Sequence, residues 1–285
     1  MNGIEHIQAA FAAARAEQRA ALMPYCTLGY PSRAATLDVL EAVARAGADL
    51  IELGVPFSDP LADGPTIQRS TQVALEQGMT VAGCLEITRQ LRARGVTQPL
   101  MLMGYINPLL AYGVERFCRD AQAAGADGMI IPDLPPEEAG ELAAACREHG
   151  LALIYLLSPA SPAERIATVA AQASGFLYLV SLTGVTGARS SLPPELPEFV
   201  ERVRTAAPGM PLAVGFGIST PEHARQVGQL ADGVIVGSAL VNAIGKAEDP
   251  MAAAGEFVAA LRKGMEEGKL STNFTNGHEL LRKDS

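Results

Sequence analysis

The sequence predicts a single (β/α)8 TIM barrel. Eight short apolar runs recur along the 285 residues, and Ala-, Glu- and Arg-rich amphipathic stretches separate them. Short runs that are apolar on both sides are typical of parallel strands covered by helices, and eight strand–helix units fit a chain of this length. A doubly wound sheet is the alternative, but the first run ends in Thr27-Leu-Gly-Tyr-Pro31, without the Gly-x-Gly-x-x-Gly turn that this fold favours.

The eight predicted strands are almost wholly aliphatic. Because Trp is absent and aromatic residues are few, aliphatic side chains and Ala must form the core. The predicted strands are Ala21–Thr27, Asp49–Leu53, Leu100–Gly104, Gly128–Ile131, Ala152–Leu157, Phe176–Ser181, Leu212–Gly215 and Gly233–Val236.

Caps and prolines mark the predicted helices. Ser32 is a candidate N-cap, and Gly or Pro stands at several expected helix ends. The predicted helices are Gly3–Arg19 across the barrel floor, Ser32–Ala46, Val114–Ala124, Pro135–His149, Ser161–Ala173, one starting at Thr220, and Ala247–Glu267. Residues 1–268 are expected to form one domain, and the polar residues 269–285 a flexible tail.

A weak internal repeat precedes three of the strands. It comprises Ala46-Gly-Ala-Asp49, Ala124-Gly-Ala-Asp127 and Leu230-Ala-Asp-Gly233. A Gly that ends a helix and a short turn into the next strand explain this pattern. The repeat supports β/α alternation and indicates no chemistry.

Composition excludes several classes of protein. With 22 basic and 31 acidic residues the net charge is −9, which argues against nucleic acid or anionic membrane as a partner. Neither a signal-peptide core nor a membrane-spanning apolar run is present in the sequence. The four cysteines lack metal or CxxC spacing, so we expect reduced thiols in a cytoplasmic protein and no metal site.

The stretch Asp49–Gln68 carries the most informative chemistry. Glu52 lies in the middle of an apolar strand, where an ionised carboxylate costs several kcal/mol unless it is paired. We therefore expect a raised pKa and a proton-handling role for Glu52. Asp63, on the following loop, should stay ionised, so that the two acids divide the acid and base duties.

Structural roles compete with these assignments. A neighbouring hydroxyl could hold Glu52 as a purely structural carboxylate. Asp63-Gly-Pro-Thr resembles a helix start, so an N-cap role is an equal alternative for Asp63. Asp59 precedes Pro60, which favours a turn role.

Phenols and glycine-rich loops are expected around the same face. In a barrel the active face lies at the carboxyl ends of the strands, where Tyr25, Thr27, Tyr105, Asp133, Tyr155 and Tyr178 fall. Glycine-rich loops follow the last three strands at Thr183–Gly187, Gly215–Ser219 and Val236–Ala239. Such loops, with a short helix beginning near Gly237 and Ser238, predict a phosphate site built from backbone amides.

Other catalytic arrangements find little support. The four histidines lack metal spacing and are expected at the surface. No lysine lies within a predicted strand, and Lys246 lies beyond the eighth, so a Schiff-base aldolase would lack its nucleophile. Cleavage of an aldol type would therefore run by acid/base catalysis alone.

The segment Glu52–Gln68 resembles the signature of the tryptophan synthase alpha subunit family. Supporting motifs follow in order along the chain: Thr27-Leu-Gly-Tyr-Pro31, Met103-Gly-Tyr-Ile-Asn-Pro108, Ile131-Pro-Asp-Leu-Pro135, Gly184-Val-Thr-Gly187 and Gly215-Phe-Gly-Ile-Ser219. The resemblance implies a barrel that cleaves indole-3-glycerol phosphate to indole and glyceraldehyde 3-phosphate without a cofactor of its own.

The resemblance also implies roles for residues. Glu52 would move protons between indole C3 and the glycerol hydroxyl, and Asp63 would hold the indole N–H. Tyr25 and Met103 would border the indole pocket, and Tyr178 would lie near the glycerol chain. Tyr105 is expected to contact substrate, and the phosphate loops are represented by Thr186, Gly187, Gly217, Gly237 and Ser238.

The family resemblance implies a partner. A beta subunit would carry pyridoxal phosphate, receive indole within an α2β2 heterotetramer and condense it with serine. The loops Gly54–Pro65 and Leu182–Arg189 would close over the substrate. Some members carry an Arg in the stretch Ser181–Gly184; Leu182 cannot make its ionic contacts.

Three alternatives differ in function. A free-standing lyase that releases indole would use the same residues. A non-catalytic regulatory barrel would not need the two acids. A sugar-phosphate isomerase or another phosphate-binding barrel is disfavoured by the lack of a strand lysine and by the segment Glu52–Gln68.

Overall fold

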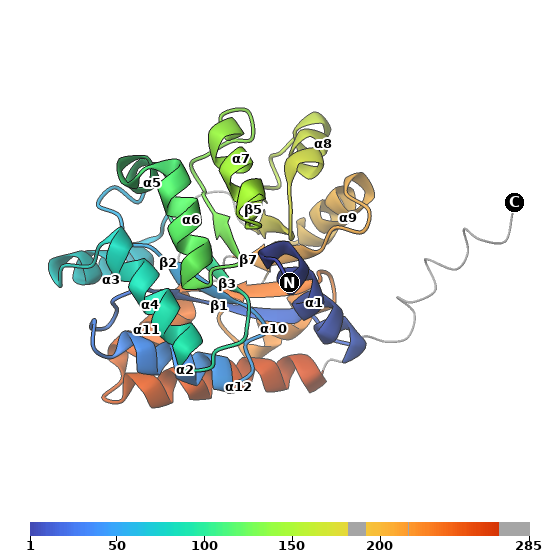
Figure 1. Ribbon diagram of the computed structural model, residues 1–285. Helices are drawn as coiled ribbons and strands as arrows, with labels where there is room; N and C mark the ends of the chain where they lie inside the picture. Colours follow the sequence, from blue (N-terminus) through green and yellow to red (C-terminus); the bar gives the residue numbers. More distant parts are fainter. Residues whose placement is uncertain (182–191, 216, 268–285) are drawn as a thin grey trace, which may run out of the picture.

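Eight parallel strands form a closed barrel in the order of the chain, with β8 pairing back onto β1 (Figure 1). The computed structural model describes residues 1–181, 192–215 and 217–267. The predicted fold class is confirmed, and each predicted strand lies within two residues of an observed one. The strands are β1 (Ala21–Thr27), β2 (Ile51–Gly54), β3 (Leu100–Met103), β4 (Gly128–Ile130), β5 (Ala152–Leu157), β6 (Leu177–Val180), β7 (Leu212–Gly215) and β8 (Gly233–Val236).

Helices surround the barrel, and the long helix α12 packs against α2 and α10. The helices are α1 (Gly3–Ala16), α2 (Thr36–Arg45), α3 (Pro65–Glu76), α4 (Val81–Ala93), α5 (Ile106–Tyr112), α6 (Val114–Ala124), α7 (Gly140–Glu148), α8 (Ala163–Gln172), α9 (Leu196–Ala206), α10 (Pro221–Gly228), α11 (Ser238–Lys246) and α12 (Pro250–Glu267). No range was predicted from the sequence for α3, α4, α5 and α9, although Asp63-Gly-Pro-Thr resembled a helix start where α3 begins.

Several predicted helix starts were wrong. Ser32 accepts a hydrogen bond from the backbone N–H of Ala35, but it caps a turn, and α2 begins only at Thr36. The helix expected from Pro135 begins at Gly140, because the preceding residues form hydrogen-bonded turns. In both cases a strong local signal for a helix start instead marks the turn that leads into it.

The alternation of side chains along β2 aims Glu52 into the barrel. Ile51 and Leu53 pack outward against the helices, within the large core between strands and helices. Glu52, between them, faces the interior, since successive strand residues point to opposite faces. The lower interior is closed by aliphatic residues of the strands and by Phe11 of α1, whose ring lies 5.6 Å from that of Phe176.

The Asp of the internal repeat has a structural role at the barrel floor. Asp49, Asp127 and Asp232 accept hydrogen bonds at 2.8–3.0 Å from backbone N–H groups at the start of β1, β3 and β7, within the first two residues of each strand. Ser174 serves β5 in the same way. Each of these four residues lies just before an even-numbered strand and accepts a backbone N–H at the start of the odd-numbered strand that precedes it in the chain. Each hydrogen bond therefore links two consecutive strands at the floor.

Arginines complete the floor. Arg19 makes two hydrogen bonds to Asp49, at 2.6 and 2.8 Å, and its side chain is 2% exposed. Arg92 binds Asp127 at 2.6 Å, and Arg204 binds Asp232 at 3.1 Å. Each of the three carboxylates therefore has a cation and an N–H donor, which offset the cost of taking it out of water.

Cys26, Cys84, Cys118 and Cys146 are buried free thiols, as expected. None of the helices in the described part of the chain combines the length and hydropathy needed to cross a bilayer. The tail predicted over residues 269–285 lies outside the described residues, and the division of the chain at residue 268 stays a prediction.

Candidate active site

A cavity of about 720 Å³ opens at the carboxyl ends of the strands. Its wall brings together most of the predicted site residues that the structure describes: Tyr25, Glu52, Asp63, Met103, Tyr178, Gly217, Gly237 and Ser238. They come from β1, β2, β3, β6 and the segments that follow β2, β7 and β8. The barrel thus gathers residues as far apart in the sequence as Tyr25 and Ser238.

Glu52 is a buried acid that forms no ion pair with any cation of the described residues. Its side chain lies on β2 opposite Tyr25 of β1, and the residue is 1% exposed. Among the described residues, its Oε2 atom has no hydrogen-bond partner. Burial raises the pKa of Glu52 to about 8, and the nearby charge of Asp63 adds to the shift. At neutral pH the carboxyl group is therefore mostly protonated and can give up its proton.

Asp63 is the second buried acid of the cavity, and the residue is 7% exposed. Burial raises its pKa to about 6, and the hydrogen bond from the Tyr105 hydroxyl opposes the shift. Asp63 is thus still mainly ionised at pH 7. The alternative N-cap role is wrong, because Gly64 is the N-cap of α3 and no side chain of the described residues caps it.

Tyr105 holds Asp63 and its loop together. Its hydroxyl accepts a hydrogen bond from the backbone N–H of Ala62 at 3.0 Å and donates one to the Asp63 carboxylate. Burial and the charge of Asp63 raise the pKa of Tyr105, so it remains a neutral donor. The sequence placed Tyr105 among the substrate-binding residues, whereas the geometry directs its hydroxyl to the acid.

Tyr25 presents a hydrogen-bond acceptor to the cavity. Ser70 donates to the carbonyl of Ile67 at 2.8 Å, so Thr27, at 2.7 Å, must donate to Ser70. Tyr25, at 3.2 Å from Thr27, must in turn donate to Thr27. The phenol proton of Tyr25 is therefore used in the hydrogen bond to Thr27, and the Tyr25 oxygen can only accept a hydrogen bond from a ligand in the cavity.

Glycines make room for the two phenols. A Cβ atom on Gly54 would lie 2.1 Å from the Tyr25 hydroxyl, and one on Gly215 would lie 2.5 Å from that of Tyr178. Burial raises the pKa of both Tyr25 and Tyr178 well above the usual value, so both stay neutral. The Gly at the end of β2 thus leaves room for the Tyr25 ring on β1, and the Gly at the end of β7 leaves room for the Tyr178 ring on β6.

The N-terminus of α11 lies at the cavity wall. The helix begins at Ser238 after Gly237, as the sequence predicted, and no described side chain caps it. Gly217, with φ of +78°, brings the segment after β7 against the same side of the cavity. Backbone N–H groups at a helix N-terminus suit a phosphate group. Thr186 and Gly187 lie outside the described residues.

Some expected positions differ from the structure, and the expected position of Asp133 is accompanied by a structural contact. Tyr155 packs outward among the helix-layer core, so its placement at the mouth was wrong. Asp133 accepts from the backbone N–H of Ile106 at 3.0 Å, at the start of α5. The expectation of surface histidines fails for His223, which is buried, and for His6, which is half-buried against Asp127 at 2.7 Å.

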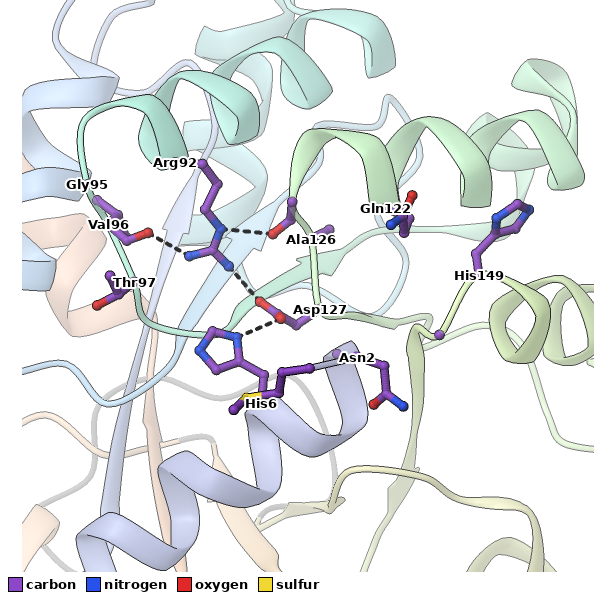
Figure 2. A pocket seen from close by; sticks show the side chains of 14 residues that line it. Asn2, His6, Arg92, Gly95, Val96, Thr97, Gln122, Ala126, Asp127 and His149 are labelled. Atoms are coloured by element: carbon purple, nitrogen blue, oxygen red, sulfur yellow. Dashed lines mark hydrogen bonds and ion pairs between the residues drawn. The ribbon is translucent and has the colours of Figure 1, made fainter.

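A second cavity, of about 740 Å³, lies at the barrel floor (Figure 2). Its central cation is Arg92, and each of the three guanidinium nitrogens already donates, to Asp127 and to backbone carbonyls. Asp127 is likewise occupied by Arg92, His6 and a backbone N–H. Within the described ranges no cluster of three or more His, Cys, Asp or Glu side chains could hold a metal ion.

Sequence reasoning missed three polar residues that support the cavity. The side chain of Gln68 donates to the carbonyl of Asp63 at 2.9 Å. Asn242 donates to the hydroxyl of Thr66 at 3.2 Å, and both residues line the cavity. Thr66 and Gln68 lie within the stretch Asp49–Gln68, so their position there was the available signal. For Asn242 the sequence offered none.

Comparisons with known proteins agree with this geometry. The family model for the tryptophan synthase alpha chain matches residues 11–269. The tryptophan synthase alpha chain of Roseiflexus castenholzii is 57% identical over 254 residues, covering 88% of this chain and 97% of that protein. A tryptophan synthase of Saccharomyces cerevisiae is 46% identical over 269 residues, covering 94% of this chain and 38% of the yeast protein. A chain of Mycobacterium tuberculosis tryptophan synthase superposes with a TM-score of 0.85 at 41% identity, covering 93% of this chain and 98% of that one.

Proposed function

This chain belongs to the tryptophan synthase alpha chain family, and we propose that Glu52 and Asp63 carry out the proton chemistry of its reaction. The reaction of the family is the cleavage of indole-3-glycerol phosphate to indole and glyceraldehyde 3-phosphate, and the chain is a lyase of this kind. One observation carries the assignment of residues. Glu52 is buried beside a second acid, and its pKa is raised to about 8.

Glu52 acts first as an acid and then as a base. Its proton passes to indole C3, which converts the ring into a positively charged indolenine. The carbon–carbon bond to the glycerol chain then breaks, and its electron pair returns to the ring. The proton of the glycerol hydroxyl passes to the Glu52 carboxylate as the aldehyde forms, so that the acid is regenerated. Burial supports both steps, since it places the pKa of Glu52 near the working pH.

Asp63 stabilises the charge that develops on the ring. In its ionised form it accepts a hydrogen bond from the indole N–H, which becomes more acidic when C3 is protonated. The attraction is strong because the site is largely dry and the hydroxyl of Tyr105 already orients the carboxylate. A fixed negative charge at this point lowers the energy of the transition state more than that of the bound substrate.

The phosphate group anchors the substrate at the opposite side of the cavity. The N–H groups at the start of α11, near Gly237 and Ser238, and the glycine segment at Gly217 supply backbone donors, and no Lys or Arg of the described residues lines the cavity. Thr186 and Gly187 belong to the same proposed phosphate site. Tyr25 and Met103 border the indole ring, and Tyr178 lies by the glycerol chain.

The proposal is tested by following indole released from indole-3-glycerol phosphate. We expect Asp63→Asn to lower kcat by about 10²- to 10³-fold, while the circular-dichroism spectrum and the binding of inorganic phosphate stay unchanged. Turnover at the wild-type rate in Asp63→Asn would remove Asp63 from the mechanism. Lost phosphate binding would show instead that the variant damages the site as a whole.

Members of this family pair with a beta subunit. For this chain we propose an α2β2 heterotetramer in which pyridoxal phosphate is held by the beta subunit alone, with indole passing between the subunits. Leu61 stands on the cavity rim with 89% of its surface exposed and is available to such a partner. Sedimentation of the mixed subunits tests the stoichiometry. The free-standing lyase would be favoured if the mixture sediments as free subunits and the isolated chain cleaves indole-3-glycerol phosphate as fast alone as in the mixture.

A further inference from the structure

Two helices that are remote in sequence meet beside the candidate active site. Helix α3 begins directly after the loop that carries Asp63, and α11 begins at the proposed phosphate donors. Figure 1 shows both helices on the same side of the barrel. Between them Asn242 Nδ2 donates to Thr66 Oγ1 at 3.2 Å, joining residues that are 176 positions apart.

An apolar contact supports this polar one. Ile67 of α3, Val241 of α11 and Tyr25 of β1 form a small buried cluster of their own. Thr66 and Asn242 are the neighbours of Ile67 and Val241 in sequence, and both line the cavity. The two helices are thus held together by an apolar contact and by one hydrogen bond at the cavity wall.

The first turn of α3 is also fixed to Asp63. The side chain of Gln68 donates to the carbonyl of Asp63 at 2.9 Å, and the backbone N–H of Gln68 donates to Gly64 at 3.0 Å. A shift of the start of α3 would therefore carry Asp63 with it. A continuous path of hydrogen bonds and helical backbone runs from the start of α11 through Asn242 and Thr66 to the acid.

We propose that Thr66 and Asn242 are positioning residues, whose hydrogen bond holds Asp63 at a fixed distance from the phosphate-binding end of α11. The inference rests on the proposed function. A substrate anchored at its phosphate can offer its ring N–H to Asp63 only when this distance matches its own length. Misplacement of a reacting group by about 1 Å can cost a factor of about 100 in rate, so a bond that limits movement between the helices bears on turnover.

The test is a double-mutant cycle on indole release. Thr66→Val keeps the side-chain shape without the hydroxyl, and Asn242→Ala removes the donor. We expect each variant to lower kcat by about 3- to 10-fold, the range of one hydrogen bond, with KM changed less than about 2-fold. The double variant should be no slower than the slower single one. Thr66→Ser, which keeps the hydroxyl, should restore most of the rate.

Gln77→Ala provides a matched control. Gln77 ties the opposite end of α3 to the segment after β1, through the backbone groups of Arg33 and Pro31. Its loss should lower the melting temperature and leave kcat unchanged. The positioning role alone would be overturned if the wild type cleaves the substrate but kcat is unaltered in Thr66→Val and Asn242→Ala. Additive losses in the double variant would overturn it as well. A wild-type chain that cleaves no indole-3-glycerol phosphate would overturn the proposed function and this inference together.

Discussion

The two ends of the barrel treat carboxylates in opposite ways. At the floor, Asp49, Asp127 and Asp232 each accept a backbone N–H and face an arginine. At the mouth, Glu52 and Asp63 lie beside each other, and burial raises the pKa of both. The floor thus pairs each of its acids with a cation and an N–H donor, whereas burial lets the acids of the mouth take up and release protons near neutral pH.

This contrast separates stability from chemistry within one fold. A paired carboxylate stabilises the folded protein and is a poor proton carrier, because protonating it would leave the charge of its partner uncompensated. An unpaired buried carboxylate costs folding energy and titrates near neutral pH. The same residue type is therefore structural at one end of the strands and functional at the other.

The largest expected effect comes from removing the acid on β2. Glu52→Gln keeps the size of the side chain but cannot transfer a proton, so kcat should fall by about 10²- to 10⁴-fold. Indole release from indole-3-glycerol phosphate measures this loss. An unaltered kcat would show that Glu52, despite its burial, is a structural carboxylate like those of the floor.

The next effect concerns the floor. Asp49→Asn removes the charge that faces the buried Arg19, and the free energy of unfolding should fall by about 3 kcal/mol. Urea denaturation measures the change, and kcat should stay within about 2-fold of wild type. Glu86→Gln, which breaks an exposed ion pair with Arg89, is the control and should leave the midpoint unchanged. A large loss of kcat in Asp49→Asn would contradict the assignment of stability to the floor and of chemistry to the mouth.

The raised pKa of Glu52 should also make the stability of the protein depend on pH. The folded state raises the pKa of Glu52 from 4.5 to about 8, so it binds more protons than the unfolded state in this interval. The contribution of Glu52 is therefore most favourable below pH 4.5 and declines as the pH rises to about 8. Urea denaturation across this interval should show a weaker decline in Glu52→Gln than in wild type. Equal slopes for the two proteins would contradict the raised pKa.

The pH profile of kcat/KM should be bell-shaped. Activity requires ionised Asp63 and protonated Glu52, so the acid limb should lie near pH 6 and the basic limb near pH 8. The residual activity of Glu52→Gln should retain the first limb and lose the second. A wild-type profile that stays flat from about pH 5 to about pH 9 would show that other groups limit the rate.

The smallest effect is expected from Tyr105→Phe. Because the hydroxyl of Tyr105 donates to Asp63, its loss should raise the pKa of Asp63 and move the acid limb to higher pH. At pH 6 we expect kcat/KM to fall by about 3- to 10-fold, the range of a single hydrogen bond, because less of Asp63 is then ionised. If Tyr105 contacts only the substrate, KM will rise and the acid limb will not move.

Local sequence patterns determined the strands and the two acids. Apolar runs gave the eight strands to within two residues, because a buried parallel strand requires aliphatic residues on both faces. The acid within one such run marked Glu52, because its polarity conflicts with its neighbours. These are properties of short segments, which the sequence displays directly.

Only the tertiary structure decided how distant residues meet. The sequence could not pair Asn242 with Thr66, Tyr105 with Asp63, or Arg19 with Asp49, because each contact depends on how the closed barrel brings separate elements together. Helix starts failed for a related reason. Pro135 and Ser32 satisfy the local rules for a start, yet turns occupy these positions, since the helices must first reach the strands they cover.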